Sequence, residues 1–481
     1  MSREDFDDPS SELEIPSRRQ ALFSARDMLL AAVAAPALPG LASAAHAKAP
    51  AVAALRVMHG FVDHAGIQLW MQSPRAQRVR VEVMDSSAPA RTLHTADMEL
   101  DARTDYAGSV EINGLEPGTQ HAYVVRRQDN KAVLAKGTFK TQALWQWRTD
   151  PPTVRIATGS CAFINEARYD RPGKPYGGGY EIYDTIAGTS PDLMLWLGDT
   201  LYLNETDYSS RAGVARRYRY QRNHDAFGKL WTACPHVALW DDHDFGPDDS
   251  DASYSGKGWT SEMFRRYWPL PFAPREDGIY GRILQGDVDI FLLDNRSSRY
   301  PNKWPNGPDK VMFGAKQMQW LKAALTYSND KPRAPFKIIA GGSQFFNKHS
   351  GDHRESWSRY PDEQADFLRW LAERKIPGVF FLSGDRHFAQ HLRIERPGLY
   401  PLNEISTSPL TSGVVTRIDD AERDSKDIVP GTMLHERNFA MITVTGPRTK
   451  RELVVEIRDA RNEKRWEWRT TAAELAQGTS A

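Results

Sequence analysis

Cysteine is scarce in this chain, and its scarcity excludes one class of small exported protein. Only Cys161 and Cys234 occur among 481 residues, whereas domains held together by disulfides are short and rich in cysteine. A single Cys161–Cys234 disulfide stays open as an alternative in an oxidising compartment. Cys161 also ends the apolar run IATGSC, which suggests a different role for its sulfur.

The chain also lacks a net charge. Sixty-two Lys and Arg residues balance 62 Asp and Glu residues, so bulk charge gives no reason to expect a nucleic-acid or acidic-lipid partner. The apolar content of 40% is ordinary for a globular protein, and the length allows two or three domains, each with its own core. Any recognition of an anion must therefore be local.

No stable membrane span is expected from the N-terminal region. Its run rich in Ala, Leu and Val, residues 28–47, is broken by two prolines and a glycine. An arginine pair in SRRQALF precedes the run, and AHA at 45–47 has the small-x-small form of a cleavage site. Residues 1–47 therefore resemble a twin-arginine export signal. This resemblance implies the twin-arginine machinery as a partner and a periplasmic or secreted location; a disordered cytoplasmic tail is the alternative.

Residues 48–145 lack a helical period of useful length. Short alternating stretches such as RVRVEVM, GSVEINGL and HAYVVRR are separated by turns, a pattern typical of β-strands. The stretch GLEPGTQHAYVV resembles the turn and following strand of fibronectin type III modules. We therefore predict an all-β sandwich of fibronectin or immunoglobulin type over 48–145, with LWQWRTDPP as the linker to the rest of the chain.

Beyond residue 152, continuous apolar runs end in polar residues. Helical patterns such as AKQMQWLKAAL and PDEQADFLRWLAERK lie between some of them, and Pro361 begins the latter. Because such runs indicate strands buried on both faces, we predict an α/β layered core over 146–481, with sheets flanked by helices and closed by a β-meander at 439–470. The six runs are VRIATGSC, DLMLWLGD, HVALWDDHD, DVDIFLLDNRSSR, KIIAGGSQ and GVFFLSGDRH.

Two regions, 203–230 and 246–282, show no strong period and contain many aromatic and basic residues. We predict loops that cover a site at the carboxyl ends of the strands, because ligands of layered α/β proteins bind there.

Three polar clusters follow strands in a defined order: Gly198-Asp199, the DDHD at 241–244 and the GDRH at 384–387. Each alone has an ordinary explanation, as a turn, a solvated acidic loop or a hydrogen-bonded histidine. Together the order resembles the calcineurin-like metallophosphoesterase superfamily. The resemblance places Asp242 at its Asn ligand, His243 at its catalytic His, and Asp385 at the first His of its last motif.

The departures from that pattern point to one branch of the superfamily. The sequence GSC replaces the first motif, and Gln344 or Ser343 stands where a lone His is expected. A strand that ends in Cys, followed by GDTLY, DDHD and SGDRH, resembles the PhoD-like alkaline phosphatases. LDNRSSR, STSPLTSG, the preceding β-sandwich and the export signal are similar as well, so the resemblance covers nearly the whole chain.

The resemblance implies a cluster of Fe³⁺ and Ca²⁺. A Cys161 thiolate and a Tyr202 phenolate are anionic donors that favour a trivalent ion, Asp199 suits a bridging role, and the remaining oxygens suit Ca²⁺. His387 would ligate one ion or support the site from outside it. The expected ligands are Cys161, Asp199, Tyr202, Asp242, Gln344, Asp385 and His387.

His243, with Asp242 beside it, is the expected catalytic residue. Neighbouring carboxylates would raise the pKa of the imidazole and keep it protonated nearer neutrality, which suits a general acid worth roughly 10²–10⁴ in rate. Asp241 and Asp244 are expected to orient the ring; a purely structural bond to one of them is the alternative. The acidic residues at 248–251 are expected to face solvent, with a calcium contact from Asp249 left open.

Arg386 and Arg296 are candidate clamps for phosphoryl oxygens, because a guanidinium can donate two parallel hydrogen bonds. A structural ion pair is an equal alternative for each. His349 and His391 are weaker candidates for any role in the site.

These residues together predict an exported, metal-dependent phosphoesterase that hydrolyses phosphomonoesters, phosphodiesters or both. Metal-activated hydroxide would attack, and His243 would protonate the leaving group. The substrates would be small phosphate esters or envelope polymers. One alternative is a phosphodiesterase or phospholipase-type enzyme of the same fold. Another is an envelope binding protein in which the β-sandwich binds the ligand and the second domain is inert.

Overall fold

The computed structural model describes residues 55–86, 91–330, 334–349 and 355–476. The export signal predicted for residues 1–47 lies outside these ranges. Within them, no helix has both the length and the apolar character needed to cross a bilayer.

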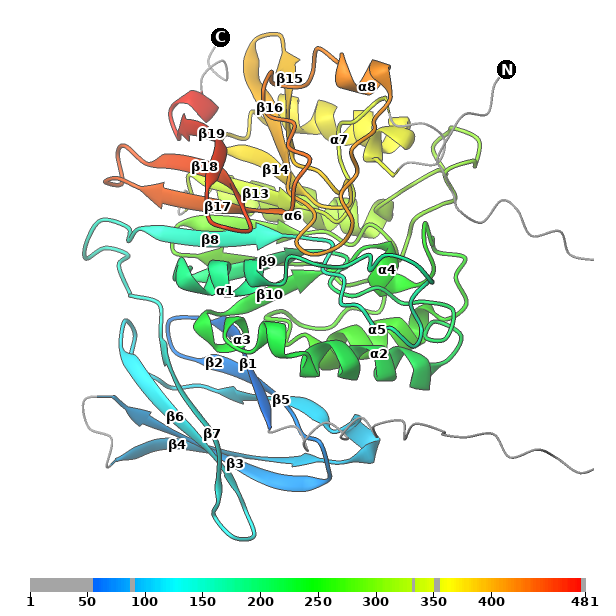
Figure 1. Cartoon of the computed structure of the whole chain (residues 1–481). Helices are drawn as coiled ribbons and strands as arrows, with labels where there is room; N and C mark the ends of the chain where they lie inside the picture. Colours follow the sequence, from blue (N-terminus) through cyan, green and yellow to red (C-terminus); the bar gives the residue numbers. More distant parts are fainter. Residues whose placement is uncertain (1–54, 87–90, 331–333, 350–354, 477–481) are drawn as a thin grey trace, which may run out of the picture. The chain divides into compact units, whose positions relative to one another are not determined.

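Seven strands form the predicted N-terminal β-sandwich (Figure 1). Three strands make one sheet in the order β1-β2-β5, and four make the other in the order β4-β3-β6-β7. Every other residue of β3, namely Val79, Val81 and Val83, is buried in the core between the sheets, as expected for half-buried strands. The strands are β1 Arg56–Val62, β2 Ile67–Gln72, β3 Gln77–Asp85, β4 Thr92–Leu100, β5 Ala107–Ile112, β6 Gln120–Arg127 and β7 Val133–Lys140.

The first sheet of the core combines parallel strands with an antiparallel meander. Its order is β10-β9-β8-β17-β18-β19; β8, β9 and β10 run parallel, and β17 pairs with β8 in the antiparallel sense. The meander predicted at 439–470 is confirmed. The strands are β8 Val154–Gly159, β9 Leu193–Leu197, β10 His236–Leu239, β17 Asn438–Thr445, β18 Glu452–Asp459 and β19 Lys464–Thr471.

The second sheet has the order β11-β12-β13-β14-β16-β15. Strands β12, β13, β14 and β16 are parallel, and an antiparallel strand closes each edge. All six predicted apolar runs are strands of the two core sheets. The strands are β11 Gly281–Gln285, β12 Val288–Leu292, β13 Phe336–Ala340, β14 Val379–Ser383, β15 Gln390–Arg396 and β16 Leu399–Ser406.

The two core sheets share one hydrophobic core, in which Ile156 and Leu195 of the first sheet pack with Ile290 and Ile338 of the second. Helices α6 and α7 add apolar side chains to this cluster, and α1, α2, α3 and α5 pack on the other face of the first sheet (Figure 1). The predicted α/β layers are confirmed. The helices are α1 Glu181–Gly188, α2 Arg211–Asn223, α3 Leu230–Ala233, α4 Asp242–Phe245, α5 Lys257–Tyr267, α6 Gly314–Asp330, α7 Pro361–Glu373 and α8 Asp420–Arg423, with short 3₁₀ turns at Ala102–Thr104, Asp225–Phe227, Trp357–Arg359 and Glu474–Ala476.

The prediction of loops over 203–230 and 246–282 is wrong in part, because α2 lies in the first region and α5 in the second. In α2 the buried positions include Arg217, Gln221 and Arg222. The Arg222 guanidinium lies 3.9 Å from the ring centre of Trp268 and 4.7 Å from that of Trp231, so aromatic faces stabilise its buried charge. Polar residues on the core-facing side conceal the apolar period that would have indicated a helix.

Candidate metal centre

The carboxyl ends of the strands of both sheets converge on Asp241, the residue that precedes α4. Gly198 follows β9 and Gly342 follows β13, and a Cβ atom on them would lie 2.6 Å from Cβ and 2.5 Å from Cγ of Asp241, respectively. Only glycine permits this approach. The polar clusters of the two sheets therefore meet at one place.

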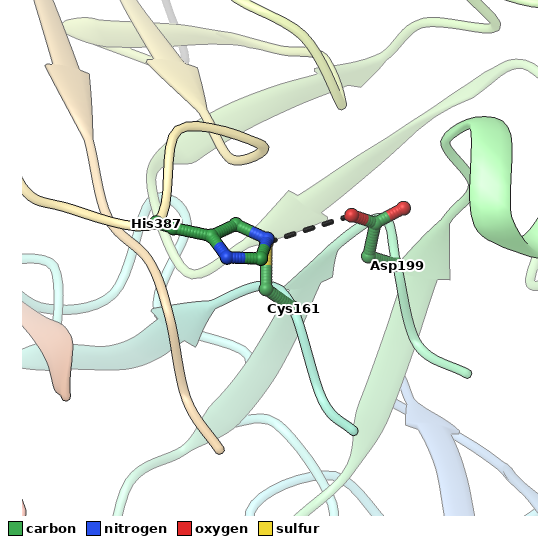
Figure 2. Close-up of side chains that lie close together, drawn as sticks. All are labelled: Cys161, Asp199 and His387. Atoms are coloured by element: carbon green, nitrogen blue, oxygen red, sulfur yellow. Dashed lines mark hydrogen bonds between the residues drawn. The ribbon is translucent and has the colours of Figure 1, made fainter. Parts of the chain in front are cut away.

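Four predicted ligands, Cys161, Asp199, Tyr202 and His387, form what we call the Cys161 cluster. Figure 2 shows three of them converging from the ends of β8, β9 and β14. Cys161 Sγ lies 3.5 Å and Tyr202 Oη 3.3 Å from Asp199 Oδ2, and Tyr202 Oη lies 3.2 Å from His387 Nε2. Neighbouring ligands of a single ion, with bonds of about 2.0–2.3 Å, are separated by similar distances.

The backbone at these strand ends is left-handed at non-glycine residues. The φ angles are 60° at Cys161, 48° at Asp199, 69° at Asp385 and 57° at His387. Each such residue costs of order 1–3 kcal/mol, and such residues concentrate at functional sites. Four of the predicted site residues thus share a conformation that most L-residues avoid.

Burial and repulsion oppose ionisation of three predicted ligands. Burial, and then the charges of Asp242 and Asp241, raise the pKa of Asp199 well above its ordinary value. Burial and Asp241 likewise raise the pKa of Asp385 to about 8, and burial and Asp199 raise that of the Cys161 thiol. A bound cation would reverse these shifts, because it stabilises the anionic form of each group.

Unpaired oxygen atoms test whether cations fit this site. Asp199 Oδ1 and Asp242 Oδ1 are buried and have no hydrogen-bond partner among the described residues, although buried polar atoms are normally paired. A thiolate, a phenolate and an imidazole suit a transition metal, and the surrounding carboxylates suit a hard divalent ion. The residues present therefore fit both predicted kinds of ion.

A second group of carboxylates, which we call the Asp242 cluster, lies beside the first. Each of Asp241, Asp242, Glu355 and Asp385 offers an oxygen within 4.8 Å of the others. Arg296 bonds to Asp241 and Glu355 and lies 3.5 Å from Asp242. Arg299 also pairs with Glu355, at 3.0 Å, so the four carboxylates of the cluster outnumber these two guanidinium groups.

His243, in α4, lies where the two clusters meet. Its ring centre is 4.0 Å from that of Tyr202, and it offers a nitrogen within 4.8 Å of Asp199 and Asp242 ligand atoms. Burial opposes ionisation of Asp242, yet the charges of His243 and Arg296 hold its pKa below the ordinary value. The imidazole is partly exposed, so a ligand can approach it.

The expectation that Asp241 and Asp244 orient His243 is wrong. Asp244 accepts hydrogen bonds from the backbone N–H groups of Thr200 and Asp241, and Asp241 is engaged by Arg296, Asn295 and Ser343. Both carboxylates hold the strand ends in place.

The carboxylate nearest to the imidazole is Asp248, which was expected only to face solvent. Its Oδ1 lies 3.3 Å from His243 Nε2, compared with 3.9 Å for Asp242 Oδ2. The Asp248 side chain is 82% exposed, so it combines a solvated position with this contact. The N–H of Asp249 donates to Asp242 Oδ2 at 2.8 Å, which fixes the same loop to the site.

Three predicted site residues are held by partners within the protein. Arg296 is fully buried in its ion pairs, and Arg386 donates to Glu422 at 2.6 Å. The Gln344 amide donates to Ser406 and accepts from Asn347. His391 is bonded to Asn403 away from both clusters, and His349 contributes to neither of them.

A sequence profile described as PhoD-like phosphatase matches residues 156–446, more than half of the chain. The chain belongs to the PhoD-like phosphatase family. Alkaline phosphatase D of Bacillus subtilis (strain 168) is 24% identical over 336 residues, which cover 60% of this chain and 54% of that protein. The chain thus spans about half the length of this curated relative.

Solved structures with the same fold extend the comparison beyond the matched segment. A structure titled as that of PhoD has a TM-score of 0.68 at 17% identity and covers 86% of this chain and 88% of its own. Purple acid phosphatase from seeds of yellow lupin (Lupinus luteus) has a TM-score of 0.60 at 11% identity, with coverage of 87% and 74%. Because both identities are below 20%, these similarities show a shared fold only.

Cys161 and Cys234 do not form a disulfide. Both are buried free thiols, so the disulfide alternative is wrong. Two further residues of the site, Glu355 and Tyr176, were not predicted from the sequence; the Tyr176 hydroxyl lies 3.1 Å from His387 Nδ1. Neither follows a core strand; the only signal near Tyr176 is the run of glycines at 177–179.

Proposed function

We propose that this PhoD-like protein is a metal-dependent hydrolase of phosphoric esters. The observation that carries the proposal is the Cys161 cluster, in which thiol, carboxylate, phenol and imidazole converge at spacings suited to one ion. The family profile supports the reaction class.

The donor atoms support Fe³⁺ in the Cys161 cluster and Ca²⁺ in the Asp242 cluster. Thiolate and phenolate donors favour the trivalent ion, whereas carboxylate oxygens suit calcium. When bound, the ions would neutralise phosphoryl oxygens and lower the pKa of a water molecule. Gln344 would become a metal ligand only if its amide oxygen gave up the hydrogen bond that it accepts from Asn347.

His243 would supply the proton for the leaving group. Nε2–H of its imidazolium would donate to the leaving alkoxide oxygen, which would replace Asp248 Oδ1 as the nearest partner of this nitrogen, and Asp242 would remain beside the charged ring. The Tyr202 ring, tilted by 34° at 4.0 Å between ring centres, packs against the imidazole and keeps it where the clusters meet. Its partial exposure leaves space for the departing group.

A second candidate, preference for diesters, is supported by the ion pairs of Arg296 and Arg386. The charge of each guanidinium is already balanced by buried carboxylates, so neither charge is left over to compensate the second negative charge of a monoester. A diester carries a single charge and needs less compensation.

The arginine pair and cleavage pattern within residues 1–47 support twin-arginine export and a periplasmic or secreted location. We also retain 48–145 and 146–481 as domain boundaries. In this arrangement the substrates would be soluble phosphate esters or envelope polymers.

Metal analysis combined with two matched substrates tests the proposal. The purified protein should contain iron and calcium and hydrolyse an aryl phosphomonoester or the diester with the same leaving group, with a rate ratio of at least about tenfold between them. Cys161→Ser should lose iron and activity, while Cys234→Ser, which alters the other buried thiol, should keep both. Full iron and activity in Cys161→Ser would contradict the ligand assignment.

A further inference from the structure

The imidazole of His387 lies between two phenols. Tyr202 Oη is 3.2 Å from Nε2, and Tyr176 Oη is 3.1 Å from Nδ1. Ser412 Oγ lies 3.5 Å from the same Nδ1, at the limit of a hydrogen bond. The backbone of Gly413 also faces the ring. Each ring nitrogen therefore has a neighbour that can either donate or accept a proton.

Tyr176 reaches this position from the segment between β8 and α1. Its ring packs edge-on against Phe163, with the ring centres 5.0 Å apart, and a Cβ atom on Gly413 would lie 2.5 Å from Tyr176 Cε2. The N–H of Gly178 donates to Thr411 O at 2.8 Å and fixes the segment. The residue as a whole is 45% exposed, and a phenol oxygen can accept one hydrogen bond while its own proton is donated to another group.

The protonation site of His387 decides whether the ring can serve the Cys161 cluster. A neutral imidazole carries its proton on one nitrogen only. With the proton on Nε2, the ring would donate to Tyr202 and could not ligate there. With the proton on Nδ1, the Nε2 lone pair faces the atoms of the cluster. Histidine ligands commonly donate their other N–H to a fixed acceptor, which also sets the ring orientation.

We propose that Tyr176 is a positioning residue that selects the Nδ1–H tautomer of His387. Of the two hydroxyls at Nδ1, that of Tyr176 is the nearer; its oxygen accepts the Nδ1 proton, and the Nε2 lone pair is left free for the ion. This inference rests on the proposed function, since the tautomer matters only if the Cys161 cluster binds metal.

The tautomer can be read in the metal-free full chain. Long-range ¹H–¹⁵N spectra of histidine-labelled protein, with His387 assigned by comparison with His387→Gln, should show Nδ1 protonated. Tyr176→Phe should give a mixture of tautomers. Tyr169→Phe removes a hydroxyl from the same segment, where the ring lies under the Arg216 guanidinium, and should leave the tautomer unchanged.

Iron affinity provides the second readout, measured by titration with Fe³⁺ in a competing chelator. Tyr176→Phe should weaken binding by about 10–100-fold, and Tyr169→Phe should match the unaltered protein. A proton on Nε2 in the unaltered chain would overturn the inference. So would a Tyr176→Phe protein with unchanged tautomer and affinity. If the unaltered chain binds no iron, the proposed function fails, while the spectra still show whether Tyr176 sets the tautomer.

Discussion

Asp199 combines two unfavourable features at the residue scale. Its backbone is left-handed, with φ of 48°, and its buried carboxylate faces the charges of Asp242, Asp241, Asp244 and Asp385. Such arrangements persist where function requires them and the surrounding structure holds them in place. The free energy of unfolding of the metal-free protein should therefore rise when this charge is removed.

Asp199→Asn tests that expectation. The metal-free variant should be more stable by about 1–2 kcal/mol, because an amide keeps the shape without the repelled charge, while its affinity for Fe³⁺ should fall sharply. Urea unfolding at pH 7 measures the first effect and chelator competition the second. Asp129→Asn, at an exposed position between β6 and β7, should change neither. A less stable metal-free Asp199→Asn protein would contradict the repulsion argument.

His243→Ala should separate substrates by leaving group. Alkyl phosphate esters need a proton on the departing oxygen, so their kcat should fall by about 10²–10⁴, whereas aryl esters with acidic leaving groups should lose much less. Rates over a series of leaving groups provide the measurement. Asp248→Asn, which keeps the imidazole, should give a far smaller loss. An equal loss on every substrate would remove His243 from the acid role.

At the residue scale, the polar motifs after the apolar runs were enough to predict those site residues that directly follow a strand. Cys161, Asp199 and His387 follow buried strands, and topology brings parallel strand ends together. Tyr176 and Glu355 reach the site from segments without a period, and their positions depend on packing that no local pattern encodes. The partner of His243 was misassigned for a similar reason: α4 turns the neighbouring Asp241 and Asp244 away from the ring.

At the scale of elements, α2 shows why some helices escaped prediction. Its core-facing side contains Arg217 and Arg222, which find partners only in the folded protein: a backbone carbonyl for the former and aromatic rings for the latter. The strands and α7 were predictable because their patterns are local: a continuous apolar run such as LMLWL in β9, and Pro361 at the first turn for α7.

Strand β10 carries a histidine that should make stability depend on pH. His236 Nε2 lies 2.9 Å from Leu230 O, and Trp196 Nε1 donates to His236 Nδ1 at 3.0 Å, so the folded protein holds the neutral ring. Burial lowers its pKa from 6.5 to about 3. The pKa of His236 is lower in the folded state than in the unfolded state. The stability that the neutral ring contributes is therefore fully present above pH 6.5 and is lost as the pH falls toward 3.

Between pH 7 and pH 5 this residue should account for about 2 kcal/mol of lost stability. His236→Gln should be less stable at pH 7, because a buried hydrogen-bond pair is disturbed, but should lose about 2 kcal/mol less over that interval. Urea unfolding at the two pH values gives both numbers. His94→Gln, on partly exposed β4, is the matched control. An unchanged slope in His236→Gln would assign the acid sensitivity to other groups.

At the scale of the whole molecule, short alternating stretches without a helical period predicted the sandwich, and apolar runs separated by helical patterns predicted the α/β core. The order of the strands was not predictable: β17 inserts between β8 and β18, although nearly the whole core sequence separates it from β8. Contacts between the sandwich and the core could not be predicted from the sequence either, because they join residues about 100 to 200 positions apart. Asp105 of the sandwich pairs with Arg211 and Arg266 of α2 and α5.

Trp70 connects the sandwich to the core, and we expect the two domains to unfold as one cooperative unit. It is fully buried, its Nε1 donates to Arg266 O at 2.9 Å, and its side chain belongs to the hydrophobic cluster of α2 and α5. Trp70→Ala should therefore lower stability by about 3–5 kcal/mol and shift a single thermal transition of the whole chain in calorimetry. Val133→Ala, at an exposed edge position of β7, should shift it little. Two transitions, with the core transition unmoved by Trp70→Ala, would instead show that the sandwich unfolds as an independent module.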